Sequence, residues 1–234
     1  MARQHIEDYR AHGFAVVRGL FSADEVAELA HAFERVHAEA MIHGRSFRIQ
    51  NTVFTIDHDD ALGPIVRMVQ WPSYFNKVLE RTRRDPRIFE LLEPLLGRDM
   101  KQIINQMHWK PPGAAMAEFG YHQDSRSRRP REAYRDLANS YVQTGIAIDP
   151  HSARNGAMMI YPGSHRLGEL PFDPARRSMH VALENDDLTR LGLDPAKAVT
   201  LELDAGDFGR RDFPADLRGG LLHFGEVNDD ENET

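Results

Sequence analysis

The residues His122, Gln123 and Asp124 carry the clearest chemical signal in the sequence. They follow Phe-Gly-Tyr at 119–121, an aromatic run that is typical of a strand. Side chains at positions i and i+2 of a strand point to the same face, so this imidazole and this carboxylate can reach one ion together. A second histidine from a distant strand would complete a set of two histidines and one carboxylate, which binds Fe(II) and leaves coordination positions open.

Other histidines compete for this site, because the chain contains twelve. Residues 58–60 (His-Asp-Asp) repeat the His-x-Asp pattern, but their run of acids favours a solvated turn. His165, in the Pro-Gly-Ser-His run at 162–165, and His223, which follows apolar residues of a predicted strand, both compete for the third position. A surface polar turn at 122–124 and hydrogen-bonded strand ends at His165 and His223 are the alternatives that the residues alone leave open.

Helices are predicted in the first half of the chain. These elements must help to position the candidate metal ligands. Ser22 and Glu25 form a capping-box pattern before a helical repeat of apolar residues, so a helix is expected over about 23–40. Further helices are expected at 62–79 and 86–96, and strands at 13–20 and 46–56.

Short strands dominate the second half. They are predicted at 100–109, 118–123, 140–148, 156–161, 198–203 and 220–224, with a loop and a short helix at 184–197. Helices followed by several short strands predict a mainly β fold, a sandwich or barrel, with flanking helices.

Composition excludes several classes of protein. With 234 residues, 28% charged residues and no long linker, the chain is expected to form one globular domain over 1–234. The absence of cysteine excludes disulfides and thiolate chemistry, and a net charge of −7 argues against nucleic-acid binding. No apolar run is long enough to span a membrane, and the first residues lack a secretory pattern, so a cytoplasmic protein is expected.

An Arg-rich stretch at 126–135 is the one basic cluster. It is suited to an anionic substrate or a phosphate group, but a solvated loop with surface ion pairs is the simpler interpretation. Trp71, Tyr74 and Phe75 are aromatic residues that could line a pocket, but core packing is the better interpretation at this spacing.

Several segments, taken in order, resemble the phytanoyl-CoA dioxygenase family of Fe(II)- and 2-oxoglutarate-dependent oxygenases. The most specific are Gln106-Met107-His108-Trp109-Lys110-Pro111-Pro112-Gly113, then Tyr121-His122-Gln123-Asp124, then the Asn-Gly…Pro-Gly-Ser-His-x-x-Gly block at 155–168. The N-terminal strand and capped helix, and the region from Gly206 to Asn228, also match. The resemblance runs from about residue 6 to the C-terminus.

The resemblance implies roles for particular residues. His122, Asp124 and His223 would bind Fe(II), and Gln106 and Lys110 would contact 2-oxoglutarate. His165 would not be a ligand; it would stabilise a strand end or face the substrate side. The implied fold is a double-stranded β-helix, the cupin-like jelly roll.

The implied reaction is the oxidation, usually hydroxylation, of a C–H bond of a small molecule by O2, with succinate and CO2 as co-products. Three alternatives remain. The chain could be a catalytically silent relative that binds or regulates. It could be a cupin-like metal enzyme that does not use 2-oxoglutarate. A zinc hydrolase is the third, although the sequence lacks the Glu-bearing helix motif of such enzymes. The oligomeric state and the substrate are not readable.

One departure from the family pattern concerns the co-substrate. The family usually carries an arginine after the distal histidine, where it pairs with the distal carboxylate of 2-oxoglutarate, and the corresponding position here is Thr234. We therefore expect the C-terminal strand of the domain to lie beyond the given chain; a substitute cation or impaired co-substrate binding are the alternatives.

Overall fold

The structure is a computed structural model that describes residues 4–109, 111, 121–122, 132, 141–168, 185–211 and 221–225. At 185–187, 210–211 and 221–225 it describes the backbone. The predicted strand at 118–123 and the Arg-rich stretch at 126–135 lie almost entirely outside the described residues.

Local signals explain where the main helices begin and end. The capping box predicted at Ser22 and Glu25 is present, and α2 ends at Gly44 in the left-handed conformation. Asp85 caps α4, whose first residue is proline. The helices are α1 (Gln4–His12), α2 (Ala23–His43), α3 (Lys77–Arg83), α4 (Pro86–Leu96) and α5 (Asn185–Arg190), with 3-10 turns η1 (Pro72–Tyr74), η5 (Ala153–Asn155), η6 (Ser164–Leu167) and η8 (Pro195–Lys197).

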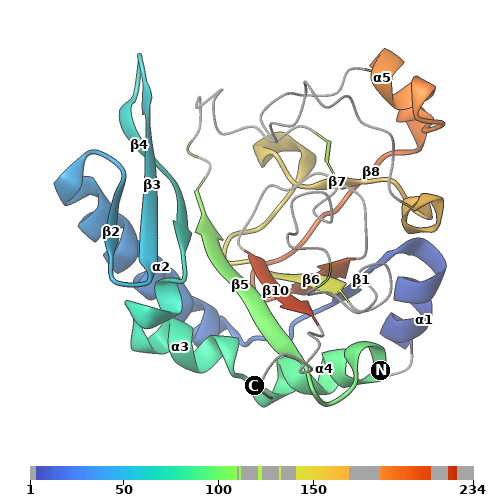
Figure 1. Ribbon diagram of the computed structural model, residues 1–234, viewed down its shortest axis with the longest axis horizontal. Helices are drawn as coiled ribbons and strands as arrows, with labels where there is room; N and C mark the ends of the chain where they lie inside the picture. Colours follow the sequence, from blue (N-terminus) through green and yellow to red (C-terminus); the bar gives the residue numbers. More distant parts are fainter. Residues whose placement is uncertain are drawn as a thin grey trace.

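The strands form one large antiparallel sheet and one small one (Figure 1). The eight-stranded sheet has the order β1-β9-β6-β10-β5-β4-β3-β2, and β7 pairs with β8 across from it. Their bounds are β1 (Phe14–Val17), β2 (Phe47–Ile49), β3 (Thr52–Asp59), β4 (Gly63–Gln70), β5 (Lys101–His108), β6 (Tyr141–Ile146), β7 (Met159–Ile160), β8 (Val199–Thr200), β9 (Phe208–Arg211) and β10 (Leu221–Gly225). Two sheets and a helical layer are the arrangement that the predicted jelly roll with flanking helices requires.

The core is divided between the two faces of the large sheet. Helices α2 and α3 pack on β3, β4 and β5 through residues that include Phe54 and Met107, and α4 packs on β6 and β9. On the other face, Ala147, Met158, Ile160, Leu201 and Leu203 form a separate cluster against β1. The interior between the two sheets is therefore distinct from the core beneath the helices.

The helix predicted at 62–79 is wrong. Residues 63–70 form β4, which pairs with β3 and β5, and only residues 77–83 are α-helical. The helices predicted at 23–40 and 86–96 are confirmed. The strand predicted at 46–56 forms two strands, β2 and β3, and β3 continues to Asp59; the remaining predicted strands within the described ranges are present with bounds that differ by a few residues. Helix α1 and strand β9 were not predicted.

No helix among the described residues is long and apolar enough to cross a membrane. The cytoplasmic location stays a prediction.

Candidate functional site

The central strands β6, β10 and β5 present one face to the interior between the sheets. On β6, Val142 packs into the core under the helices, so its neighbour Gln143 belongs to the opposite face. His223 on β10 is directly opposite Gln143 in the register and directly opposite Ile104 on β5. Because paired residues of antiparallel strands share a face, the backbone register assigns position 223 to the interior.

Gln106 and His108 lie on the same face of β5. Met107, between them, is buried in the core under α2 and α3, so its two neighbours point the other way. The His108 Nε2 and Gln106 Oε1 atoms are 3.4 Å apart, and Gln106 is directly opposite Gln70 on β4. The candidate co-substrate residue Gln106 is thus on the interior face, one strand from His223.

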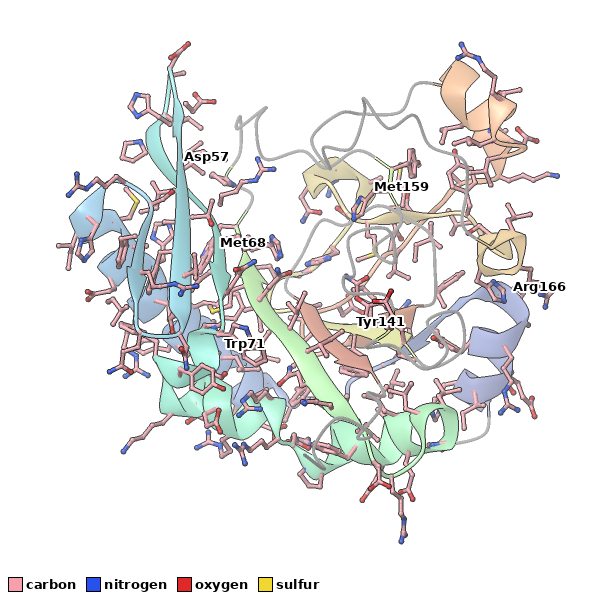
Figure 2. All side chains as sticks on the ribbon, viewed as in Figure 1. Asp57, Met68, Trp71, Tyr141, Met159 and Arg166 are labelled. Atoms are coloured by element: carbon pink, nitrogen blue, oxygen red, sulfur yellow. The ribbon has the colours of Figure 1, made fainter. Side chains whose placement is uncertain are left out.

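Tyr121, the residue before His122, packs against the small sheet. The hydroxyl of Tyr121 donates to Met159 Sδ on β7 at 3.5 Å, and the Tyr121 ring packs on Tyr161 with centroids 5.2 Å apart. His122 itself is half-buried. Figure 2 shows Met159 at the small sheet and Tyr141 at the large one, which marks the two walls of the interior. The residue before His122 thus contacts the small sheet, whereas His223 belongs to a strand of the large sheet.

The side chains of three further predicted site residues are not described. Asp124 and Lys110 lie outside the described residues, and His223 is described by its backbone. The described side chains do not include the complete predicted set, and among them no three or more potential metal ligands lie together. The triad of His122, Asp124 and His223 stays a prediction.

His165 has a structural role at the end of α1. Its Nε2 lies 3.2 Å from the carbonyl oxygen of Arg10, and Arg166 donates to the carbonyl oxygens of Arg10 and Ala11. Burial lowers the pKa of His165, and the charge of Arg166 lowers it further, against the opposing effect of the Arg10 carbonyl. Of the two predicted options for His165, these contacts agree with the structural one, although they stabilise the end of α1 and not the end of a strand.

The second His-x-Asp pattern lies at a turn, as expected. His58 is exposed near the end of β3, and the Asp59 carboxylate accepts the backbone N–H groups of Ala61 and Leu62. This Asx-type turn closes the β3–β4 hairpin, so Asp59 has a local structural task.

A charged pair in the β3–β4 hairpin was missed by sequence reasoning. Arg67 is only 4% exposed, and its Nη1 lies 3.9 Å from Asp57 Oδ2. Burial lowers the Arg67 pKa, and the charge of Asp57 partly offsets this effect. The sequence feature that could have revealed this pair is a single arginine inside the apolar run 65–69.

A small hollow, partly open to solvent, lies against the helical side of the large sheet. Leu29 of α2, Leu79 of α3 and Met107 of β5 line it, and all three belong to the hydrophobic core there. Gln106, the candidate co-substrate residue, also lines this hollow, so the hollow extends to strand β5. Its apolar lining nevertheless belongs to the core under the helices and not to the interior between the sheets.

The aromatic residues singled out at 71–75 divide between core and surface. Phe75 packs against the core under α2, whereas Tyr74 is 57% exposed and its ring lies 5.7 Å from that of Trp71. The core interpretation is correct for Phe75.

Comparison with known proteins gives a consistent family. The family model described as phytanoyl-CoA dioxygenase (PhyH) matches residues 9–208. Curated relatives include an ectoine dioxygenase of Bordetella parapertussis, 26% identical over 76% of this chain and 56% of the relative. Another is a probable alpha-ketoglutarate-dependent hypophosphite dioxygenase of Stutzerimonas stutzeri, 24% identical over 71% of this chain and 54% of the relative. The chain thus spans a little over half the length of these relatives.

Solved structures share the fold. EctD from S. alaskensis, solved with 2-oxoglutarate and 5-hydroxyectoine, has a TM-score of 0.70 at 18% identity, over 97% of this chain and 76% of that one. The epimerase SnoN, solved with Fe3+, alpha ketoglutarate and nogalamycin RO, has a TM-score of 0.57 at 20% identity, over 97% of this chain and 78% of that one. At these identities the likeness concerns the fold, and it agrees with the jelly roll predicted from the sequence.

Proposed function

This chain belongs to the phytanoyl-CoA dioxygenase family, and from that premise we propose that it is an Fe(II)- and 2-oxoglutarate-dependent dioxygenase. It would oxidise, normally hydroxylate, a C–H bond of a small molecule with O2 and release succinate and CO2. The observation that carries the proposal is the match of the family model to residues 9–208, and the β10 register, which pairs His223 with Gln143 of β6 and Ile104 of β5, supports a role for His223.

The residues fit such a metal. Two imidazoles and one carboxylate are the ligand set that Fe(II) oxygenases use, and they leave positions for a co-substrate and O2. His122, Asp124 and His223 would hold Fe(II), while Gln106 and Lys110 would hold 2-oxoglutarate. Bound Fe(II) and 2-oxoglutarate would supply the oxidising power, and the protein would orient the substrate and exclude water.

The names of the relatives suggest a small polar substrate. The curated relatives are named for ectoine and for hypophosphite, and one structural neighbour carries 5-hydroxyectoine. Gln70, Gln106 and His108 give the described interior face a polar wall, which suits such a substrate better than a lipid.

Succinate formation with Fe(II) and 2-oxoglutarate is the direct test. The wild-type protein should convert 2-oxoglutarate to succinate, at least in uncoupled turnover, and each of His122→Ala, Asp124→Ala and His223→Ala should abolish it. His58→Ala, at the exposed hairpin turn, is the matched control and should keep full activity.

Two results would contradict the proposal. Normal turnover by Asp124→Ala would remove that residue from the ligand set. Tight Fe(II) binding without any succinate from the wild-type protein would favour the silent binding relative or a metal enzyme that does not use 2-oxoglutarate.

A further inference from the structure

The small hollow beside β5 is lined mainly by apolar side chains and has room for a small molecule. Its apolar lining comes from six residues of the core under the helices, which are Leu29, Phe33, Leu79, Met107, Ile146 and Ile148. The hollow has a volume of about 40 Å³, whereas about 10–15 Å³ is enough to hold one water molecule. It therefore admits a molecule of a few heavy atoms and excludes one as large as 2-oxoglutarate.

The polar side chains that line the hollow already have partners. The Arg83 guanidinium donates to the Glu80 carboxylate at 2.6 Å, and Asn105 Oδ1 accepts the backbone N–H of Ser73 at 3.3 Å. The Thr82 hydroxyl donates to a carbonyl oxygen of the preceding turn of α3 at 2.9 Å. An ion or a chain of waters needs several polar contacts when it is buried, so this lining favours an apolar occupant.

The hollow reaches β5 at the point where the neighbouring strand begins. Leu221, the first residue of β10, is directly opposite Gln106 on β5 and Gly145 on β6. Met107 and Ile146, the next residues of those two strands, line the hollow. At this place β5 and β6 extend past the first residue of β10, so a passage between them does not break the β10 ladder.

Gln106 borders both the hollow and the interior between the sheets. Its neighbour Met107 belongs to the core under the helices, so the Gln106 side chain lies on the interior face, with Oε1 3.4 Å from His108 Nε2. Gln106 also lines the hollow. The residue that is the candidate contact of 2-oxoglutarate is thus the residue at which the two spaces meet.

We propose that this hollow binds O2 and admits it to the interior between the sheets. The gas enters from the side that is open to solvent, occupies the apolar space under α2 and α3, and passes Gln106 to the face where the co-substrate binds. The inference rests on the proposed function, because it names the entry site of one of the reactants of that reaction.

The physical chemistry of O2 suits the hollow. O2 is small, uncharged and weakly hydrated, so its transfer from water into an apolar space is favourable. Apolar cavities in proteins stay dry and bind gases such as xenon. The two carboxylates of 2-oxoglutarate would lose their hydration in such a space. The two co-substrates therefore approach Gln106 from opposite faces of β5.

The paramagnetism of O2 allows the site to be tested on the metal-free protein. Methyl groups that O2 approaches relax faster, so the probe is O2 itself, dissolved under pressure in a methyl-labelled sample. The methyl groups of Met107, Ile146 and Ile148 should show a relaxation enhancement at least about threefold larger than those of Ile88 and Met158. The two control residues are buried in other clusters of the core.

A bulky residue at position 148 should close the hollow. Ile148→Trp should lower the enhancement at Ile146 to that of the control residues, and should raise the O2 concentration for half-maximal succinate formation at least about threefold. The KM for 2-oxoglutarate should stay as in the wild type. Leu95→Trp, at a partly buried position of α4 outside the hollow, is the matched control and should change none of these values. Ile148→Phe takes the place of Ile148→Trp if the larger side chain prevents folding.

Two results would overturn the proposal. One is a response to O2 in the methyl groups of the hollow that is no larger than in the controls. The other is an unchanged O2 dependence of succinate formation in the folded variant at position 148. A wild-type protein that forms no succinate would contradict the proposed function instead, and the relaxation measurement on the metal-free protein still decides whether the hollow binds O2.

Discussion

The imidazole of His165 lies directly against the backbone of Gly13. A Cβ atom at position 13 would come within 2.4 Å of His165 Nδ1, and Gly13 has a φ of +81° that only glycine adopts freely. The backbone N–H of Gly163 donates to the His12 carbonyl at 2.8 Å in the same region. The Pro-Gly-Ser-His segment thus holds the junction between α1 and β1.

Replacement of Gly13 by alanine should therefore destabilise the protein strongly. The positive φ and the overlap with His165 together should lower the free energy of unfolding by roughly 2–4 kcal/mol. Gly44→Ala is the matched control, because Gly44 has a φ of +60° and an added Cβ atom there would meet nothing within 4 Å, so the change should cost about 1 kcal/mol. Urea denaturation of both variants measures the difference, and equal losses would show that the His165 contact is unimportant.

Three half-buried histidines should make stability depend on pH. Burial lowers the pKa of His37, of His151 and of His165 below that of the unfolded chain. A base with a lowered pKa in the folded state contributes stability that is complete above its unfolded pKa, about 6.5, and is lost as the pH falls. We expect the free energy of unfolding to decrease from pH 7 to pH 5.

His151 gives the cleanest test of that dependence. Its Nδ1 is buried without a hydrogen-bond partner among the described residues, and desolvation outweighs the opposing charge of Asp149. His151→Gln should reduce the change of the free energy of unfolding between pH 7 and pH 5, measured by urea denaturation. The same substitution at the exposed His58 should leave that change as it is in the wild type. An identical slope in His151→Gln and the wild type would exclude this residue as a source.

The error at residues 62–79 has a physical cause in the bulge at Arg67. Val66 and Val69 are three residues apart and face the same core, a spacing that is typical of a helix. Thr55 pairs with Met68 and Ile56 pairs with Val66, so Arg67 is an extra residue in β4. This extra residue produces the helix-like spacing within a strand, and the sequence alone does not reveal it. Helix α1 was missed for another reason: His5 and Tyr9 are its only buried residues, so it lacks a wide apolar stripe.

Features that depend on residues close together in the sequence were predicted better than features that depend on distant residues. The α2 capping box depends on residues three apart, and it was predicted to the residue. The placement of His165 depends on contacts with Arg10 and Gly13, more than 150 residues earlier, which no local pattern encodes. For the candidate site, the β10 register agrees with a role for His223, while its partnership with Asp124 stays a prediction.

Asp207 should be one of the most sensitive positions for stability. Its carboxylate is 3% exposed and accepts hydrogen bonds from the backbone of Gly19 at 2.8 Å, from the backbone of Asp204 at 2.9 Å and from the guanidinium of Arg18. Burial alone would raise the pKa of Asp207, but these hydrogen bonds and the Arg18 charge together lower it. The carboxylate thus links the end of β1 to the start of β9.

Asp207→Ala would remove a buried carboxylate that accepts the backbone N–H groups of Gly19 and Asp204, and should lower the free energy of unfolding by roughly 2–4 kcal/mol. Because the Asp207 pKa is lowered, its contribution is present above about pH 4 and is lost as the pH falls further. Thermal unfolding at pH 7 is the measurement, with the exposed Asp24→Ala as control. A loss no larger than that of the control would contradict the assigned role.

Gln106 should determine affinity for 2-oxoglutarate if the proposed function is correct. Its side chain is on the interior face of β5, and loss of one hydrogen bond to a charged ligand costs about 1.5–3 kcal/mol. Gln106→Ala should therefore raise the KM for 2-oxoglutarate about tenfold or more, with Fe(II) affinity unchanged. Gln102→Ala, on the same strand but bound to Arg83 of α3, should lower stability slightly and leave that KM unchanged. Equal KM values for Gln106→Ala and the wild type would exclude Gln106 from the co-substrate site, because a residue that touches the carboxylates of 2-oxoglutarate is not removed without effect.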